Sequence, residues 1–123
     1  MLPSMPEFSR EAEFQIRKAE RLLADRQERR ERLLEAARQA ARILRAEYGA
    51  RRVWLFGSLR RPWFHEGSDV DLAVEGVATE RIGHAWDRIA GVVGHAVDLV
   101  SLDEAAEGLR RRVLESGELI DDG

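Results

Sequence analysis

The stretch LFGSLRRPWFHEGSDVDLAVEG, Leu55 to Gly76, places two aspartates on alternate positions at the start of an apolar run. Alternate residues of a β-strand point to the same face of a sheet, so Asp69 and Asp71 are predicted to share one face while the intervening apolar residues face the core. Two carboxylates at that spacing raise each other's pKa unless a cation lies between them. A divalent metal ion is therefore expected at this strand.

A third aspartate strengthens this expectation. Asp98 lies alone within the apolar run Ala96–Val100, where an unpaired charge would be costly to bury. If that strand lies beside the Asp69 strand, the three carboxylates converge. Oxygen ligands without histidine or cysteine favour Mg²⁺ or Mn²⁺ over zinc, and Mg²⁺ commonly takes phosphate oxygens as further ligands. The pattern indicates a nucleoside triphosphate as the substrate.

The beginning of the stretch is suited to phosphate binding. Gly57 has no Cβ, so its backbone allows a phosphate to come close, and Ser58 adds a hydroxyl donor. Arg60 and Arg61 follow, and guanidinium groups complement phosphate oxygens. Each feature alone is common in turns. Together with the aspartates they predict a nucleotide site.

The rest of the chain divides into an arm and a small domain. Residues 9–48 contain no proline or glycine and predict a long helix, with a buried apolar stripe in its second half formed by Leu33, Leu34, Ala37, Ala40, Ala41 and Leu44. In the first half Arg26 and Arg30 interrupt the stripe, which leaves two interpretations: a solvated charged helix, the more common case, or a surface bound by a partner.

After Gly49 the pattern is that of strands and shorter helices. The expected elements are strands at 52–56, 70–74 and 96–100, a helix at 79–93, a helix capped at Ser101 and ending near Glu115, and a possible last strand at 118–120. This order predicts an α+β fold, layered as in α/β proteins, with an N-terminal helical arm at 1–48 and a domain at 49–123.

Composition excludes several classes of function. The net charge is −3 although 35% of the residues are charged, so no basic field is available for strong nucleic-acid binding. There are no cysteines, no secretory signal and no apolar run that could span a bilayer. We expect a cytoplasmic protein without membrane association.

The combination of motifs resembles a known family. Gly57-Ser58, ten intervening residues, Asp69-Val70-Asp71 and the later Asp98 are similar to the nucleotidyltransferase superfamily of DNA polymerase β. The short length resembles its minimal nucleotidyltransferases (MNT), many of which are encoded beside a HEPN-domain partner. The resemblance covers about residue 47 to the C-terminus and implies a polymerase β-like palm with a small mixed sheet.

The resemblance also implies roles for individual residues. Asp69 and Asp71 would hold both metal ions, and Asp98 would complete the catalytic metal site and help to deprotonate the acceptor hydroxyl. The nucleotide-binding residues would be Gly57, Ser58, Arg61 and Ser68. The family commonly continues Gly-Ser-x-x-Arg-Gly, whereas here Pro62 follows the arginine and removes one backbone N–H, and the bulky Trp63-Phe64-His65 comes next.

The function implied is that of an antitoxin that transfers AMP from ATP, with Mg²⁺ or Mn²⁺, to a hydroxyl of a HEPN-type toxin. Two alternatives stay open: a small-molecule nucleotidyltransferase of the antibiotic-modifying kind acting as a homodimer, and a non-catalytic module that neutralises a toxin by binding it. A template-guided polymerase is disfavoured, because the chain has no room for a nucleic-acid-guiding domain and lacks a basic surface with interleaved aromatic residues.

Overall fold

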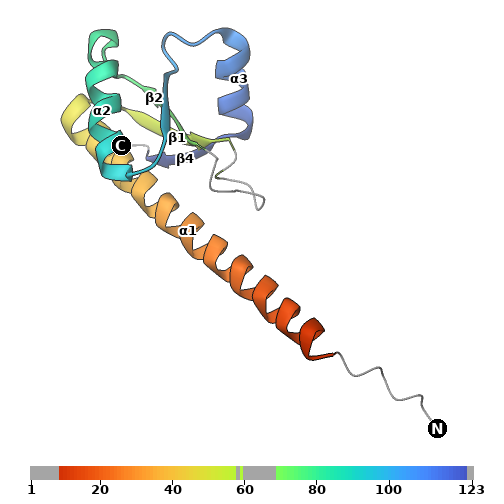
Figure 1. Ribbon diagram of the computed structural model, residues 1–123. Coiled ribbons are helices and arrows are strands. Elements are labelled where there is room, and N and C mark those ends of the chain that lie inside the picture. The colour runs from red at the N-terminus through yellow and green to blue at the C-terminus, as the bar shows by residue number, and fades with distance from the viewer. Residues whose placement is uncertain (1–8, 58, 60–68, 122–123) are drawn as a thin grey trace.

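A computed structural model describes residues 9–57, 59 and 69–121 (Figure 1). The elements follow one another as α1 (Arg10–Tyr48), β1 (Arg52–Phe56), β2 (Val70–Glu75), a 3₁₀ turn η2 (Thr79–Arg81), α2 (Ile82–Val93), β3 (Val97–Ser101), α3 (Glu107–Ser116) and β4 (Glu118–Asp121). The expected α+β fold with a small mixed sheet is confirmed. No helix in the described part of the chain is long and apolar enough to cross a membrane.

The four strands form one sheet in the order β3-β2-β1-β4. β1 pairs antiparallel with both β2 and β4, whereas β2 and β3 are parallel. A parallel pair requires a crossover connection, and η2 with α2 supplies it. The last strand, predicted only as a possibility, therefore completes the sheet at the edge next to β1.

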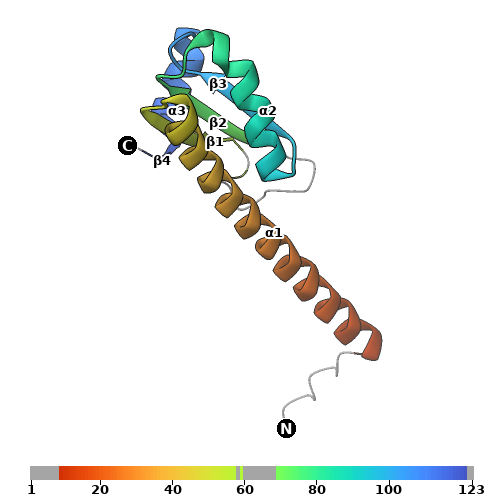
Figure 2. The same ribbon diagram turned by 90° about the vertical axis from the view of Figure 1, so that its left-hand side faces the viewer.

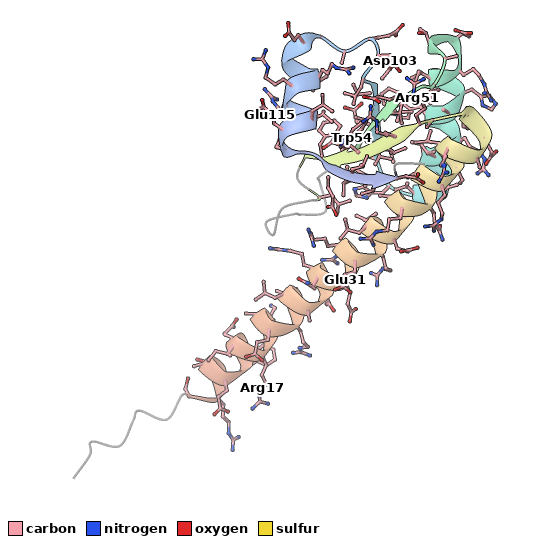
Figure 3. The ribbon with its side chains drawn as sticks, turned by 180° about the vertical axis from the view of Figure 1, so that it is seen from behind. Arg17, Glu31, Arg51, Trp54, Asp103 and Glu115 are labelled. Carbon is pink, nitrogen blue, oxygen red and sulfur yellow. The ribbon has the colours of Figure 1, made fainter. Side chains whose placement is uncertain are left out.

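Helices cover both faces of the sheet (Figure 2). One face packs against α1 and α2 in the larger apolar cluster, which includes Leu44, Leu55, Leu72 and Ile89. The other face packs against α3 in a smaller cluster made of Trp54, Ala73, Leu102 and Val113. Figure 3 shows Trp54 on the α3 side of the sheet. The two clusters form a three-layer domain.

Helix α1 belongs to the domain only in its C-terminal part. Ser9 caps its start by accepting a hydrogen bond from the N–H of Ala12, and Gly49 ends it in the left-handed conformation with φ of 75°. The residues buried in the core are Ala37, Ala40, Ala41, Leu44 and Tyr48. The predicted packing of this stripe is confirmed.

The N-terminal part of α1 extends into solvent, away from every other element (Figures 1 and 3). All residues from 13 to 28 are exposed, and Arg17 and Glu31 project outward from the helix. We refer to residues 10–28 as the projecting segment.

The start of α3 differs from the prediction. The sequence Ser101-Leu102-Asp103-Glu104 predicts an N-cap for this helix, but α3 begins at Glu107 after Ala106, which makes no side-chain cap. Ser101 instead ends β3 opposite Val74, and Asp103 accepts a hydrogen bond from the N–H of Gly76 at 2.8 Å. Pairing with β2 outweighs the local capping preference.

Two leucines of α1 provide a test of this arrangement. Leu44 is fully buried and Leu23 is 62% exposed. Leu44→Ala should lower the free energy of unfolding by about 2–5 kcal/mol, because it leaves a cavity in the core, and Leu23→Ala by less than about 0.5 kcal/mol. Urea denaturation measures both. Equal losses would contradict the exposure of the projecting segment in the isolated chain.

Candidate active site

The aspartates lie where β2 and β3 run side by side. Asp71 and Asp98 are direct partners in the parallel register, and Asp69 immediately precedes β2. Alternation places all of them on the sheet face that α3 covers, because Val70 and Leu72 are buried in the cluster on the opposite face. The sequence prediction that the Asp98 strand lies beside the Asp69 strand is confirmed.

Burial increases along this face of β2 from Asp69 to Glu75. Asp69 is exposed, Asp71 is half-buried, and Ala73 and Glu75 lie under α3. Among the described elements, α3 thus covers the C-terminal half of the strand and leaves its aspartate end uncovered. A ligand can reach the carboxylates from this end.

Glu75 is a buried carboxylate that the motif-based prediction does not include. It is 4% exposed and pairs with Arg52 of β1 at 2.7 Å and with Arg110 of α3 at 3.6 Å. The signal is present in the sequence, since Glu75 continues the alternation that begins with the two aspartates. Its partners neutralise it, so Glu75 holds α3 on the sheet, whereas the aspartates have no such arginine among the ion pairs of the described residues.

Gly57 lies against the carboxylate of Asp71, the middle one of the three aspartates. It follows β1 with φ of 77°, and a Cβ built there would overlap Asp71 Oδ2 and lie 3.0 Å from Asp71 Cγ. Phe56, the preceding residue, is the register partner of Asp71. Glycine is therefore favoured by the positive φ, and a side chain here would displace the Asp71 carboxylate. The first residue of the predicted phosphate loop and the predicted metal ligand form one site.

The electrostatics of the site favour a cation. Burial, together with the negative charges of Asp98 and Asp69, raises the pKa of Asp71 from 3.8 to about 6. Each of these causes disfavours the ionised carboxylate in the free protein. A positive charge on this face would offset all of them.

The donor set fits a hard divalent cation in its chemistry. Asp69, Asp71 and Asp98 offer carboxylate oxygens of the kind that Mg²⁺ and Mn²⁺ prefer. Within residues 9–57, 59 and 69–121, however, no group of three or more His, Cys, Asp or Glu side chains is gathered tightly enough to hold a metal ion. The aspartate side chains share a face and influence one another without forming a closed ligand cage.

Other predicted site residues lie outside the described part of the chain. These are Ser58, Arg61 and Ser68, together with Pro62 and Trp63-Phe64-His65. Leu59 is described: it is fully buried in the larger cluster, and its carbonyl accepts a hydrogen bond from Arg30 Nε at 2.9 Å. No local pattern predicts this contact, which ties α1 to the segment that follows Gly57.

A pair of glycines separates backbone strain from damage to the site. Gly49 has φ of 75° with nothing within 4 Å of the position that a Cβ would take, whereas at Gly57 the added carbon meets Asp71. Both Gly49→Ala and Gly57→Ala should lose about 1–2 kcal/mol of stability from the left-handed conformation. Only Gly57→Ala should also abolish ATP binding measured by calorimetry. Unimpaired ATP binding by Gly57→Ala would show that this contact is not part of the site.

The raised pKa of Asp71 predicts how stability depends on pH. Folding disfavours ionised Asp71, so in EDTA the wild-type protein should lose stability as pH rises from about 4 to above 6. Asp71→Asn should remove that loss and melt at a higher temperature than wild type at pH 7.5. Asp87→Asn, at an exposed position on α2, is the control. Parallel pH profiles for wild type and Asp71→Asn would contradict the desolvation of this carboxylate.

Comparison with known proteins agrees with the resemblance to the polymerase β nucleotidyltransferases. The family model described as "Polymerase beta, Nucleotidyltransferase" matches residues 38–122. No curated protein shows significant similarity to the chain.

Solved structures share the fold. A structure described as a minimal nucleotidyltransferase is 37% identical, with a TM-score of 0.58 over 68% of this chain and 89% of that one. A toxin–antitoxin structure with AMP-PNP is 26% identical, with a TM-score of 0.60 over 67% and 69% of the two chains. A complex of tri-AMPylated Shewanella oneidensis HEPN toxin with an MNT antitoxin, 21% identical with a TM-score of 0.50 over 80% and 73%, agrees in fold alone.

The family match covers the whole sheet, α2, α3, the part of α1 from residue 38 onward, and each of the predicted site residues in the described part of the chain. The chain belongs to the polymerase β nucleotidyltransferase family.

Proposed function

We propose that this protein transfers AMP from ATP to a hydroxyl group on a HEPN-type partner protein and thereby acts as its antitoxin. The observation that carries the proposal is the meeting of three strands at one end of the sheet. There Gly57 contacts Asp71, and Asp71 lies in register with Asp98.

Each residue has a defined part in the proposed reaction. Asp69, Asp71 and Asp98 would hold Mg²⁺, which supplies charge neutralisation and orientation of the phosphates when bound. Gly57 lets the triphosphate approach the end of β1, with Ser58, Arg61 and Ser68 as further donors. Asp98 accepts the proton of the acceptor hydroxyl. The hydroxyl oxygen then bonds to the α-phosphorus of ATP. The bond between that phosphorus and the oxygen bridging to the β-phosphate breaks, and pyrophosphate leaves.

The choice of nucleotide and acceptor draws on the comparisons and on the open site. AMP-PNP, present in the 26% identical toxin–antitoxin structure, is an analogue of ATP, which supports ATP as the donor. Among the described residues, the aspartate end of the sheet is bordered by the ends of short strands, which supports an acceptor presented by another molecule. A cytoplasmic location is proposed because ATP and Mg²⁺ are available there.

Intact-mass spectrometry of the partner tests this function. A HEPN-type partner protein of this chain should gain the mass of one or more AMP groups when it is co-expressed with wild type. Asp98→Asn should reduce the transfer rate by on the order of 10²-fold or more, because it removes the proton acceptor and a metal ligand. Asp87→Asn, on the exposed face of α2, should transfer at the wild-type rate.

Loss of function in cells completes the test. If modification silences the toxin, Asp98→Asn should fail to neutralise it, since an added nucleotide carries the negative charge that repels RNA phosphates. An unmodified partner that wild type and Asp98→Asn neutralise equally would refute the catalytic proposal and leave the binding module. AMP transfer to small hydroxyl compounds alone would favour the antibiotic-modifying alternative.

A further inference from the structure

Beyond the interruption at Arg26 and Arg30, the apolar stripe of α1 resumes outside the domain. At 100° per residue, the outer residues Ala12, Ile16, Ala19, Leu22 and Leu23 lie on the same face of the helix as the buried Ala37, Ala41 and Leu44. Ile16, Leu22 and Leu23 are 43%, 55% and 62% exposed. We call these five outer residues the outer stripe.

The outer stripe faces the space next to the active-site end of the sheet. Tyr48 at the end of α1 is followed closely by the start of β1, and Arg30 bonds to Leu59 just beyond the end of β1. The 18 residue steps from Arg30 to Tyr48 span about 27 Å of helix, and β1 spans about 13 Å of extended chain. β1 therefore runs back along α1, and the bond from Arg30 to Leu59 places the C-terminal end of β1, which Gly57 follows, near the point where the projecting segment leaves the domain.

The charges beside the stripe disfavour a second copy of this chain as the occupant. A parallel pairing of two outer stripes would place Arg26 and Arg30, which continue the stripe toward the domain, against the same arginines. An antiparallel pairing would bring the acidic flank formed by Glu13 and Glu20 against itself. The parallel arrangement buries arginines against each other, and the antiparallel one brings carboxylates together with only partial compensation from the Arg17–Glu13 ion pair at 3.5 Å.

We propose that the projecting segment is the docking surface for the acceptor protein, through an apolar helical surface of that protein which carries an acidic group opposite Arg26. The inference rests on the proposed function in one respect, that the acceptor is a protein. Apolar contacts to Ile16 and Leu23 would supply affinity, and Arg26 would fix the register. A protein held there would lie beside Gly57 and the aspartates, so docking and positioning of the acceptor hydroxyl would be one event.

The chain contains a matched control. Phe14 is 56% exposed, similar to Leu23, but lies about 150° around the helix from the centre of the outer stripe. Leu23→Asp should raise the dissociation constant for a HEPN-type partner protein by on the order of tenfold or more, and Arg26→Glu should act in the same direction. Phe14→Asp should leave it unchanged. All three variants should keep wild-type ATP affinity and melting temperature, because residues 13–28 are exposed.

The outcomes are distinct from those that test the reaction. Equal binding by wild type and Leu23→Asp, equal weakening by Phe14→Asp, or no association at all would overturn the docking proposal. A wild-type dimer that Leu23→Asp dissociates in sedimentation would assign the stripe to self-association, and a structured RNA bound through it would assign it to nucleic acid.

Undiminished AMP transfer by Leu23→Asp at limiting partner concentration would refute docking while the function stands. An unmodified partner whose binding still depends on Leu23 would refute the function while docking stands.

Discussion

The parallel pairing of β2 with β3 is the constraint on which the site depends. It places Asp71 and Asp98 directly opposite each other, although they are 27 positions apart in the chain. No short turn can form a parallel pair, so the crossover through α2 is required, and α2 is held by apolar contacts with α1 and the sheet. The core on one face thus fixes the distance between charges on the other.

The two faces of the sheet serve different purposes. The face under α1 and α2 is wholly apolar in its central residues and provides the main core. The face under α3 has a smaller apolar cluster around Trp54 and Ala73, with Phe56 and Val100 packed against it, and its carboxylates have two kinds of environment. Glu75 is paired with two arginines and fastens α3, whereas Asp71 is partly desolvated next to other negative charges. An unfavourable arrangement of this kind is expected where a ligand supplies the missing charge.

Much of the fold is predictable because its signals are local. The uninterrupted run of helix formers predicts α1 almost to the residue, and the alternation at Asp69-Val70-Asp71 correctly assigns opposite faces. The predicted start of α3 is wrong, since pairing of Ser101 with β2 depends on residues far away in the sequence. The contact of Gly57 with Asp71 and the bond from Arg30 to Leu59 also join distant segments, and no periodicity within either segment encodes them.

The residues of the candidate site can be selected from the sequence by their type and spacing. The contacts between them cannot. Asp69, Asp71 and Asp98 are identifiable because burying an isolated charge in an apolar strand is costly. Each aspartate can therefore be recognised from its immediate sequence neighbours. Their side chains do not form a closed cage in the free chain, which is the expected behaviour of like charges without a cation between them. The cation is therefore the element that should convert this face into a nucleotide site.

Calorimetric titration of the wild-type protein with ATP tests that claim most directly. With Mg²⁺ or Mn²⁺ in excess, ATP should bind at a single site per chain, and in EDTA the heat of binding should disappear because three carboxylates would repel the triphosphate. Equal ATP affinity in the presence and absence of the divalent cation would contradict the account.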